Sequence, residues 1–262
     1  MPRVFRYAAD TNAPLPQNAP HMHAANYALS IYPSDAVYSF IPKNACTTLR
    51  YSLALAHGAI EDESKFSWIH DNNQTFRATL PELVRARYAF VILRDPFLRL
   101  ASCFLDKFVD QTAVALSFER SQNQPGSRHD LTFRDFVASL GALLRADEHW
   151  RPQVDYLVYK TYDDVFCLED FGFAVSTLKA KIDFDVHDAR RLSRHGADQY
   201  EAIAGDDCAA DLSAFDLLAL KRTGKAPQLR NFYDAGLVDK VAALYADDLA
   251  LYRDWTGRKP IF

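Results

Sequence analysis

Apolar and aromatic residues fall into short runs along the chain, and these runs alternate with stretches of helical spacing. Three runs have the length of a β-strand, and they cover residues 36–41, 88–93 and 165–168. The second run is apolar or aromatic at every position, as in a strand that is buried on both faces. Each run leads through a loop into apolar positions spaced three or four residues apart. This alternation predicts an α/β fold in three layers, with a mostly parallel sheet and helices on both faces.

Polar residues mark where several of the predicted helices begin. Helices are expected over residues 49–55, 96–108, 133–144 and 174–182, and from residue 237 to about 252. Asp95 stands where an N-cap is expected, and Pro96 follows at the first helical position. Thr132 is the expected cap of the helix that starts at Phe133. The second strand is therefore expected to lead almost directly into a helix.

Other segments lack this periodicity. Residues 1–30 carry four prolines among Ala, Asn and His, which predicts a flexible, loosely attached N-terminal arm. Residues 31–262 are then expected to form a single domain. A long exposed loop is predicted over residues 111–130, and loops of this length often border a site.

Composition narrows the class of protein. The chain has 262 residues, of which 49% are hydrophobic and 24% charged, with a formal net charge of −4, as in a soluble globular protein. This charge argues against a nucleic-acid partner or an anionic membrane surface. The best apolar run stops at Arg94, well short of the roughly 20 residues that a membrane span needs. The four cysteines show no CxxC spacing, so a cytoplasmic, reducing compartment is expected, without structural zinc or a disulfide framework.

The loop after the first strand has the chemistry of an anion cradle. Residues 42–48 read Pro-Lys-Asn-Ala-Cys-Thr-Thr and stand between the strand and a helix. Lys43, the hydroxyls of Thr47 and Thr48, and the backbone N–H groups at the helix start suit a phosphate or sulfate. The loop is not a Walker A motif, because it has no glycine and its lysine comes too early.

The loop after the second strand offers a second anion-binding group. Arg94 follows the strand directly, and Ser102 comes eight residues later, about two turns along the next helix. Taken alone, Arg94 is better explained by an ion pair at the strand end, and Thr47 or Ser102 by capping and helix packing. Together, the two loops predict a ligand with phosphates at two separated positions.

Both loops resemble those of a known enzyme family. Residues 40–49 look like the 5′-phosphosulfate loop of sulfotransferases that use 3′-phosphoadenosine 5′-phosphosulfate (PAPS), and residues 93–102 resemble their 3′-phosphate loop. The likeness is greatest to the carbohydrate sulfotransferases of the HNK-1 and chondroitin or dermatan 4-O type. It extends over about residues 35–182 and includes residues 106–108, 131–133, 149–153 and 162–163.

The resemblance implies the P-loop-like sulfotransferase fold and a role for each matching residue. Lys43 is expected to contact the 5′-phosphosulfate and the bridging oxygen of the leaving group, while Arg94 and Ser102 hold the 3′-phosphate. The remaining cofactor-binding residues that it implies are Pro42, Asn44, Ala45, Cys46, Thr47 and Thr48. The implied reaction is an in-line transfer of the sulfuryl group from PAPS to an acceptor hydroxyl, with no metal required.

The acceptor that the resemblance implies is a carbohydrate or glycoconjugate. The animal relatives are Golgi proteins with an N-terminal anchor and with cysteines after the segment that matches residues 149–153. This sequence shows neither feature, and residues 156–159 stand in the place of the cysteines. A cytoplasmic, bacterial form is therefore expected, with its oligomeric state left open.

The reaction also needs a base that is neutral and basic near pH 7, which favours histidine. His70 falls between the two loops, where related heparan sulfate 2-O-sulfotransferases carry their base, and His149 lies in the segment of residues 149–153. Both remain candidates, with His70 preferred. A loop histidine capped by Asp71 and a packed histidine beside Trp150 are the corresponding structural interpretations.

Two other functions remain open. A Mg²⁺-dependent kinase or NTPase would place Thr47 or Thr48 on the metal and Asp95 as its acid, although the loop lacks the glycines that such enzymes use. A catalytically silent binding module would keep the fold as an interaction surface. Cys46 is expected to be a small, partly buried packing residue. Glu169 is expected to cap a helix or to contact the acceptor. The basic residues at 190–195 and 221–230 are expected to form solvent-exposed faces or to help bind an anion.

Overall fold

The computed structural model describes residues 3–122, 127–193, 200–203 and 208–262. The chain forms two compact units and passes between them several times. The first unit consists of Met1–Arg94, Pro152–Ser193 and Asp254–Gly257, and the second of Asp95–Arg151, Arg194–Arg253 and Arg258–Phe262. Neither unit is a continuous stretch of chain, and the single domain predicted over residues 31–262 stays a prediction.

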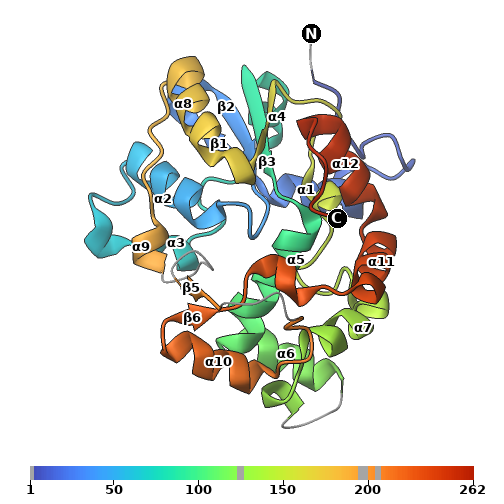
Figure 1. The fold of residues 1–262 in the computed structure, drawn as a ribbon. Coiled ribbons are helices and arrows are strands. Elements are labelled where there is room, and N and C mark those ends of the chain that lie inside the picture. The colour runs from blue at the N-terminus through green and yellow to red at the C-terminus, as the bar shows by residue number, and fades with distance from the viewer. Residues whose placement is uncertain (1–2, 123–126, 194–199, 204–207) are drawn as a thin grey trace. The chain divides into compact units, whose positions relative to one another are not determined.

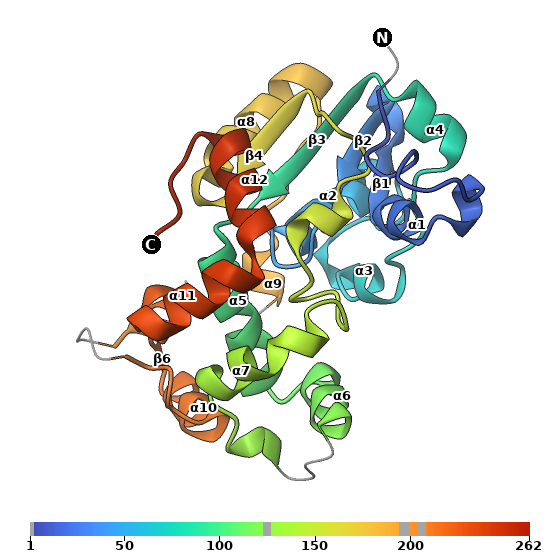
Figure 2. The same ribbon diagram turned by 90° about the vertical axis from the view of Figure 1, so that its right-hand side faces the viewer.

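A four-stranded sheet lies in the first unit (Figure 1). Its strands, in spatial and sequence order, are β1 (Ala28–Ile31), β2 (Ala36–Ser39), β3 (Tyr88–Leu93) and β4 (Asp164–Cys167). The β1 strand pairs antiparallel with β2, whereas β2 with β3 and β3 with β4 are parallel. Figure 2 shows the four strands side by side. The predicted α/β fold with a mostly parallel sheet is therefore confirmed.

Helices cover both faces of this sheet. Side chains alternate along β2 and β3, so Tyr38 and Phe90 lie on one face and Val37 and Ala89 on the other. The first face packs against α2 (Cys46–Ala56) and α8 (Phe171–Ile182) through Leu49, Leu53, Ala174 and Leu178. The second face packs against α1 (Ala19–Asn26) and α4 (Leu80–Arg85) through Ala24 and Leu83. The same unit also contains α3 (Trp68–Asp71) and α9 (Arg190–Ser193).

The second unit has a largely helical, aromatic core. Its helices are α5 (Pro96–Phe104), α6 (Ala113–Ser121), α7 (Phe133–Leu143), α10 (Ala214–Arg222) and α11 (Ala235–Leu244), with a π-helix over Leu105–Val109. A short parallel pair joins β5 (Glu201–Ala202) to β6 (Lys225–Ala226). The core contains Phe104, Phe108, Phe133, Phe136, Trp150 and Phe232, all 3% exposed or less. The last helix, α12 (Ala246–Thr256), begins in this unit and ends in the first.

The predicted helix starts are confirmed by their hydrogen bonds. The Asp95 carboxylate caps α5 by accepting from the backbone N–H groups of Phe97 and Leu98 at 2.8 and 3.2 Å. Thr132 and Asp135 form a capping box at the start of α7, in which each side chain accepts from the other residue's backbone N–H. Both helices therefore begin where the sequence predicted.

Three segments differ from the sequence prediction. The predicted arm over residues 1–30 contains α1 and all but the last residue of β1. Pro20 lies in the first turn of α1 and does not mark a loop. Residues 113–121 of the predicted loop form α6. The closing helix is two helices, α11 and α12, with Tyr245 between them. None of the helices in the described ranges is long and apolar enough to cross a membrane.

Candidate functional site

The loop between β2 and α2 adopts an unusual backbone conformation. Lys43 and Ala45 have φ angles of 73° and 56°, in the left-handed region that residues with a Cβ rarely occupy. Such a conformation costs an L-residue about 1–2 kcal/mol, and strained backbone of this kind tends to cluster at functional sites. Left-handed residues near a helix start turn successive N–H groups inward and so form an anion-binding concavity.

The N-terminus of α2 is open to an anion. Ala45 is its N-cap residue and supplies no side-chain hydrogen bond, so capping does not occupy the positive end of this helix. The α5 helix differs, because Asp95 already fills its N-terminus. Lys43 and Thr47 are half-buried beside the open end, and Thr48 is buried. This loop is therefore the better of the two helix starts for binding a phosphate or sulfate.

Asn44 lies inside this loop. Its side chain is fully buried, and Nδ2 donates to the Ile92 carbonyl of β3 at 2.8 Å and to Gln153 Oε1 at 2.7 Å. These contacts hold the loop against the end of the neighbouring strand. The predicted role of Asn44 in cofactor binding stays a prediction, and its buried side chain restricts that role to its backbone.

Arg94 joins the second loop to the first. Its guanidinium Nη1 donates to the Lys43 carbonyl at 3.0 Å. Its backbone N–H donates to Gln153 Oε1 at 3.0 Å, and its carbonyl accepts from Gln153 Nε2 at 2.9 Å. The structure thus brings together Lys43, Asn44 and Arg94, which belong to the two anion-type loops of the sequence.

Ser102 and Asp95 lie in the second unit. Ser102 is 9% exposed on α5, one turn beyond Leu98 on the same helix face. Asp95 is 1% exposed, and its second carboxylate oxygen accepts from the Ile261 N–H at 2.8 Å. Because backbone groups occupy both oxygens, Asp95 acts as a helix cap, which argues against its role as the metal-binding acid of a kinase.

His70 lies on α3, in the first unit. Its side chain is exposed, and its ring makes an edge-to-face contact with Phe66 at 5.5 Å between centroids. Arg50 of α2 holds this short helix by donating to the Ile69 carbonyl at 2.8 Å. The helix that follows the β2–α2 loop therefore positions the segment that carries His70.

His149 lies in the second unit and is paired with a carboxylate. Its Nδ1 lies 2.7 Å from Asp147 Oδ1, and its side chain is 17% exposed. Burial raises the pKa of Asp147, but hydrogen bonds from the His149 ring and backbone lower it by more, with a smaller contribution from Lys107, so the net pKa lies below the ordinary value. A carboxylate at one ring nitrogen favours the tautomer with a proton there. The other ring nitrogen, Nε2, lies 3.8 Å from Glu148 Oε1.

The minor candidates of the sequence have local partners. Cys46 is half-buried, and its sulfur lies 4.0 Å from the Thr47 hydroxyl. Glu169 accepts from the Cys167 thiol at 2.7 Å. In the basic segments, Arg190 pairs with Asp188 at 2.7 Å and Lys221 with Asp110 at 2.5 Å. Arg194 and His195 lie outside the described residues.

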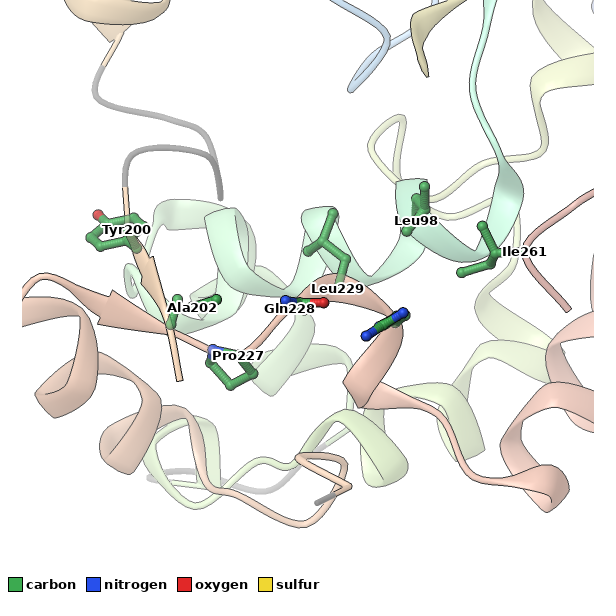
Figure 3. A pocket seen from close by; sticks show the side chains of 9 residues that line it. Leu98, Tyr200, Ala202, Pro227, Gln228, Leu229 and Ile261 are labelled. Carbon is green, nitrogen blue, oxygen red and sulfur yellow. The ribbon is translucent and has the colours of Figure 1, made fainter. Parts of the chain in front are cut away.

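A cavity of about 330 Å³ lies in the second unit (Figure 3). Leu98 of α5 and Ile261 lie at one end, and Tyr200 at the other. Its walls are mainly apolar, with Gln228 and Arg230 as polar groups; the other lining residues are Ala202, Ala226, Pro227 and Leu229. A cavity with this lining suits a flat apolar ring that carries a few polar edges.

Sequence reasoning missed the roles of Gln153 and Asp147. Gln153 is buried and meets the two loops through contacts across 59 and 109 positions of the chain, which no local pattern reveals. Asp147 comes two residues before His149 in the sequence. A carboxylate so close to a candidate base was a signal that could have been used.

Comparison with known proteins agrees with these features. Carbohydrate sulfotransferase 14 of Danio rerio is 27% identical over 134 residues, which is 44% of this chain and 36% of that protein. The chain therefore matches little more than a third of this relative's length. No solved structure matches the chain. The model of the sulfotransferase family matches residues 34–253, which include both loops and most of each unit. The chain belongs to the sulfotransferase family.

Proposed function

We propose that this protein transfers the sulfuryl group of PAPS to a hydroxyl group of a carbohydrate acceptor. The observation that carries the proposal is the hydrogen bond from Arg94 to the Lys43 carbonyl. It brings the second anion-type loop to the first, beside the open N-terminus of α2. A donor with phosphates at its 5′ and 3′ positions needs two anion-binding loops that lie close together.

The proposed reaction is an in-line displacement at sulfur. The acceptor oxygen forms a bond to sulfur while the bond from sulfur to the bridging 5′-phosphate oxygen breaks, and the acceptor proton passes to a base. Negative charge then grows on the bridging oxygen. Lys43 and the N–H groups at the start of α2 supply the positive charge that stabilises it.

We propose His149 as the base, with Asp147 orienting its ring. The 2.7 Å contact to Asp147 supports this choice, since it fixes one ring nitrogen as donor and leaves the other to accept the acceptor proton. His70, which the sequence favoured, is exposed, and its ring contacts Phe66 edge to face. It remains the second candidate because Arg50 positions its helix.

The carbohydrate acceptor is proposed from the name of the relative, carbohydrate sulfotransferase 14.

The test is transfer of labelled sulfate from PAPS to a panel of glycans and small alcohols. Turnover of the wild-type protein on a glycan is expected, together with its loss in Lys43→Ala. Lys65→Ala is the matched control, because Lys65 is an exposed lysine of the same unit outside the loops. Equal loss in both variants would contradict the role of Lys43. Phosphate transfer from ATP with Mg²⁺ would support the kinase alternative, and no transfer of either group would support the silent binding module.

A further inference from the structure

We infer that Gln153 is a positioning residue that couples the 5′-phosphosulfate loop to the 3′-phosphate loop. The inference rests on the proposed function, because it concerns the two ends of the same donor. Gln153 is fully buried, so its own side chain is not available to a ligand. Its effect on the donor must therefore pass through the residues that it holds.

The Gln153 amide contacts both loops at once. Its oxygen accepts from the Asn44 side chain at 2.7 Å and from the Arg94 backbone N–H at 3.0 Å, while its Nε2 donates to the Arg94 carbonyl at 2.9 Å. Asn44 belongs to the first loop, and Arg94 begins the second. One side chain therefore fixes the separation of the two loops at the ends of β2 and β3.

The orientation of both amides follows from the backbone groups that they meet. The Arg94 N–H can only donate and its carbonyl can only accept, which places Oε1 and Nε2 of Gln153 without ambiguity. Asn44 must then direct its NH₂ group toward Gln153 Oε1, and the Ile92 carbonyl at 2.8 Å requires the same. The network is thus set by groups whose donor and acceptor roles cannot change.

Burial makes this network rigid. Asn44 and Gln153 are both 0% exposed. Leaving a buried amide without its hydrogen-bond partner destabilises the folded protein by the full desolvation penalty of that amide. The network holds the Arg94 backbone, and the guanidinium donates to the Lys43 carbonyl at 3.0 Å. Without Gln153, each loop keeps its own residues, but their separation is no longer fixed. The affinity for a ligand that contacts both loops is then lower, because binding must also order the two loops.

The test compares two nucleotides that differ only by one phosphate. Calorimetry gives the affinities of adenosine 3′,5′-bisphosphate and adenosine 5′-monophosphate, and their ratio measures what the 3′-phosphate contributes. In Gln153→Met this ratio is expected to fall by about tenfold, the value of one net hydrogen bond. The monophosphate affinity is expected to change much less, because it uses only the first loop.

Asn18→Leu is the matched control for the loss of a buried amide. Asn18 is 1% exposed in the same unit, where it accepts from the His21 N–H at 3.0 Å and donates to the Tyr7 carbonyl at 2.7 Å. Its loss is expected to lower stability without changing the nucleotide ratio. Gln153→Glu is the second variant, since it keeps the size and the acceptor oxygen and places a carboxyl oxygen against the Arg94 carbonyl in place of the NH₂ donor. It decides the question if Gln153→Met fails to fold.

The outcomes separate the inference from the proposed function. A fallen ratio in a folded Gln153 variant, with an unchanged ratio in Asn18→Leu, supports the coupling role. An unchanged ratio, an equal loss of affinity for both nucleotides, or failure of both Gln153 variants to fold would assign a merely structural role and overturn the inference. If the wild-type protein binds neither nucleotide, the proposed function fails and the inference fails with it.

Discussion

Replacing Ala45 by glycine is expected to stabilise the protein, although the same change in a regular helix destabilises it. Ala45 has φ 56° and ψ 20° at the start of α2. A left-handed conformation costs an L-residue about 1–2 kcal/mol, and glycine avoids this cost. Glycine in turn loses about 0.5–1 kcal/mol through the greater freedom of the unfolded chain. The difference predicts a gain of about 0.5–1 kcal/mol in the free energy of unfolding.

Ala180→Gly provides the control. Ala180 is exposed and lies within α8 of the same unit, where an alanine in helical conformation should lose about 1 kcal/mol on replacement by glycine. Urea unfolding followed by circular dichroism measures both variants, with equal m-values as the condition for comparison. A loss of similar size in Ala45→Gly and Ala180→Gly would refute the left-handed conformation of Ala45, and with it the anion-binding concavity of the loop.

Three further predictions concern the second unit and the choice of base. The pKa of Asp147 lies below its ordinary value. Its contribution to stability is therefore present above about pH 4 and is lost as the pH falls through the lowered pKa. In Asp147→Asn, the free energy of unfolding measured against pH should show a smaller loss on the acid side, and an unchanged profile would count against the Asp147–His149 pair. His149→Gln is expected to abolish sulfuryl transfer while nucleotide affinity is kept, whereas His70→Gln retains turnover; the reverse result would make His70 the base. Thr132→Ala should lower the free energy of unfolding by about 1 kcal/mol through loss of the capping box with Asp135, and no measurable change would contradict the cap.

Local patterns were sufficient for the elements that lead into the site. The strand over residues 88–93 has the predicted bounds, because six consecutive apolar or aromatic residues have the length and composition of a strand covered on both faces. Asp95 and Pro96 likewise mark the start of α5 by their own chemistry. The resemblance to sulfotransferases rested on the two loops after β2 and β3, and the family match confirms it.

Contacts between residues far apart in the sequence could not be predicted from local patterns. The hydrogen bonds of Gln153 join residues 59 and 109 positions away in the sequence. The left-handed residues of the β2–α2 loop are not glycines, so their residue types did not predict this conformation. The prediction at Pro20 was wrong for a different reason, because proline suits the first turn of an α-helix as well as a loop. The N-terminal segment was therefore expected to be an arm, where α1 and β1 are found.

The central claim is that the two loops bind one donor through its 5′ and 3′ phosphates. Calorimetric titration with adenosine 3′,5′-bisphosphate in metal-free buffer tests it most directly, with Arg94→Ala beside Arg87→Ala as the control. Arg87 is an exposed arginine that precedes β3, whereas Arg94 follows it. The account predicts binding without metal that weakens about 10- to 100-fold in Arg94→Ala, as expected for a charge-assisted contact to phosphate, and that persists in Arg87→Ala. Equal binding by both variants, or binding of ATP with Mg²⁺ in preference to the bisphosphate, would contradict it.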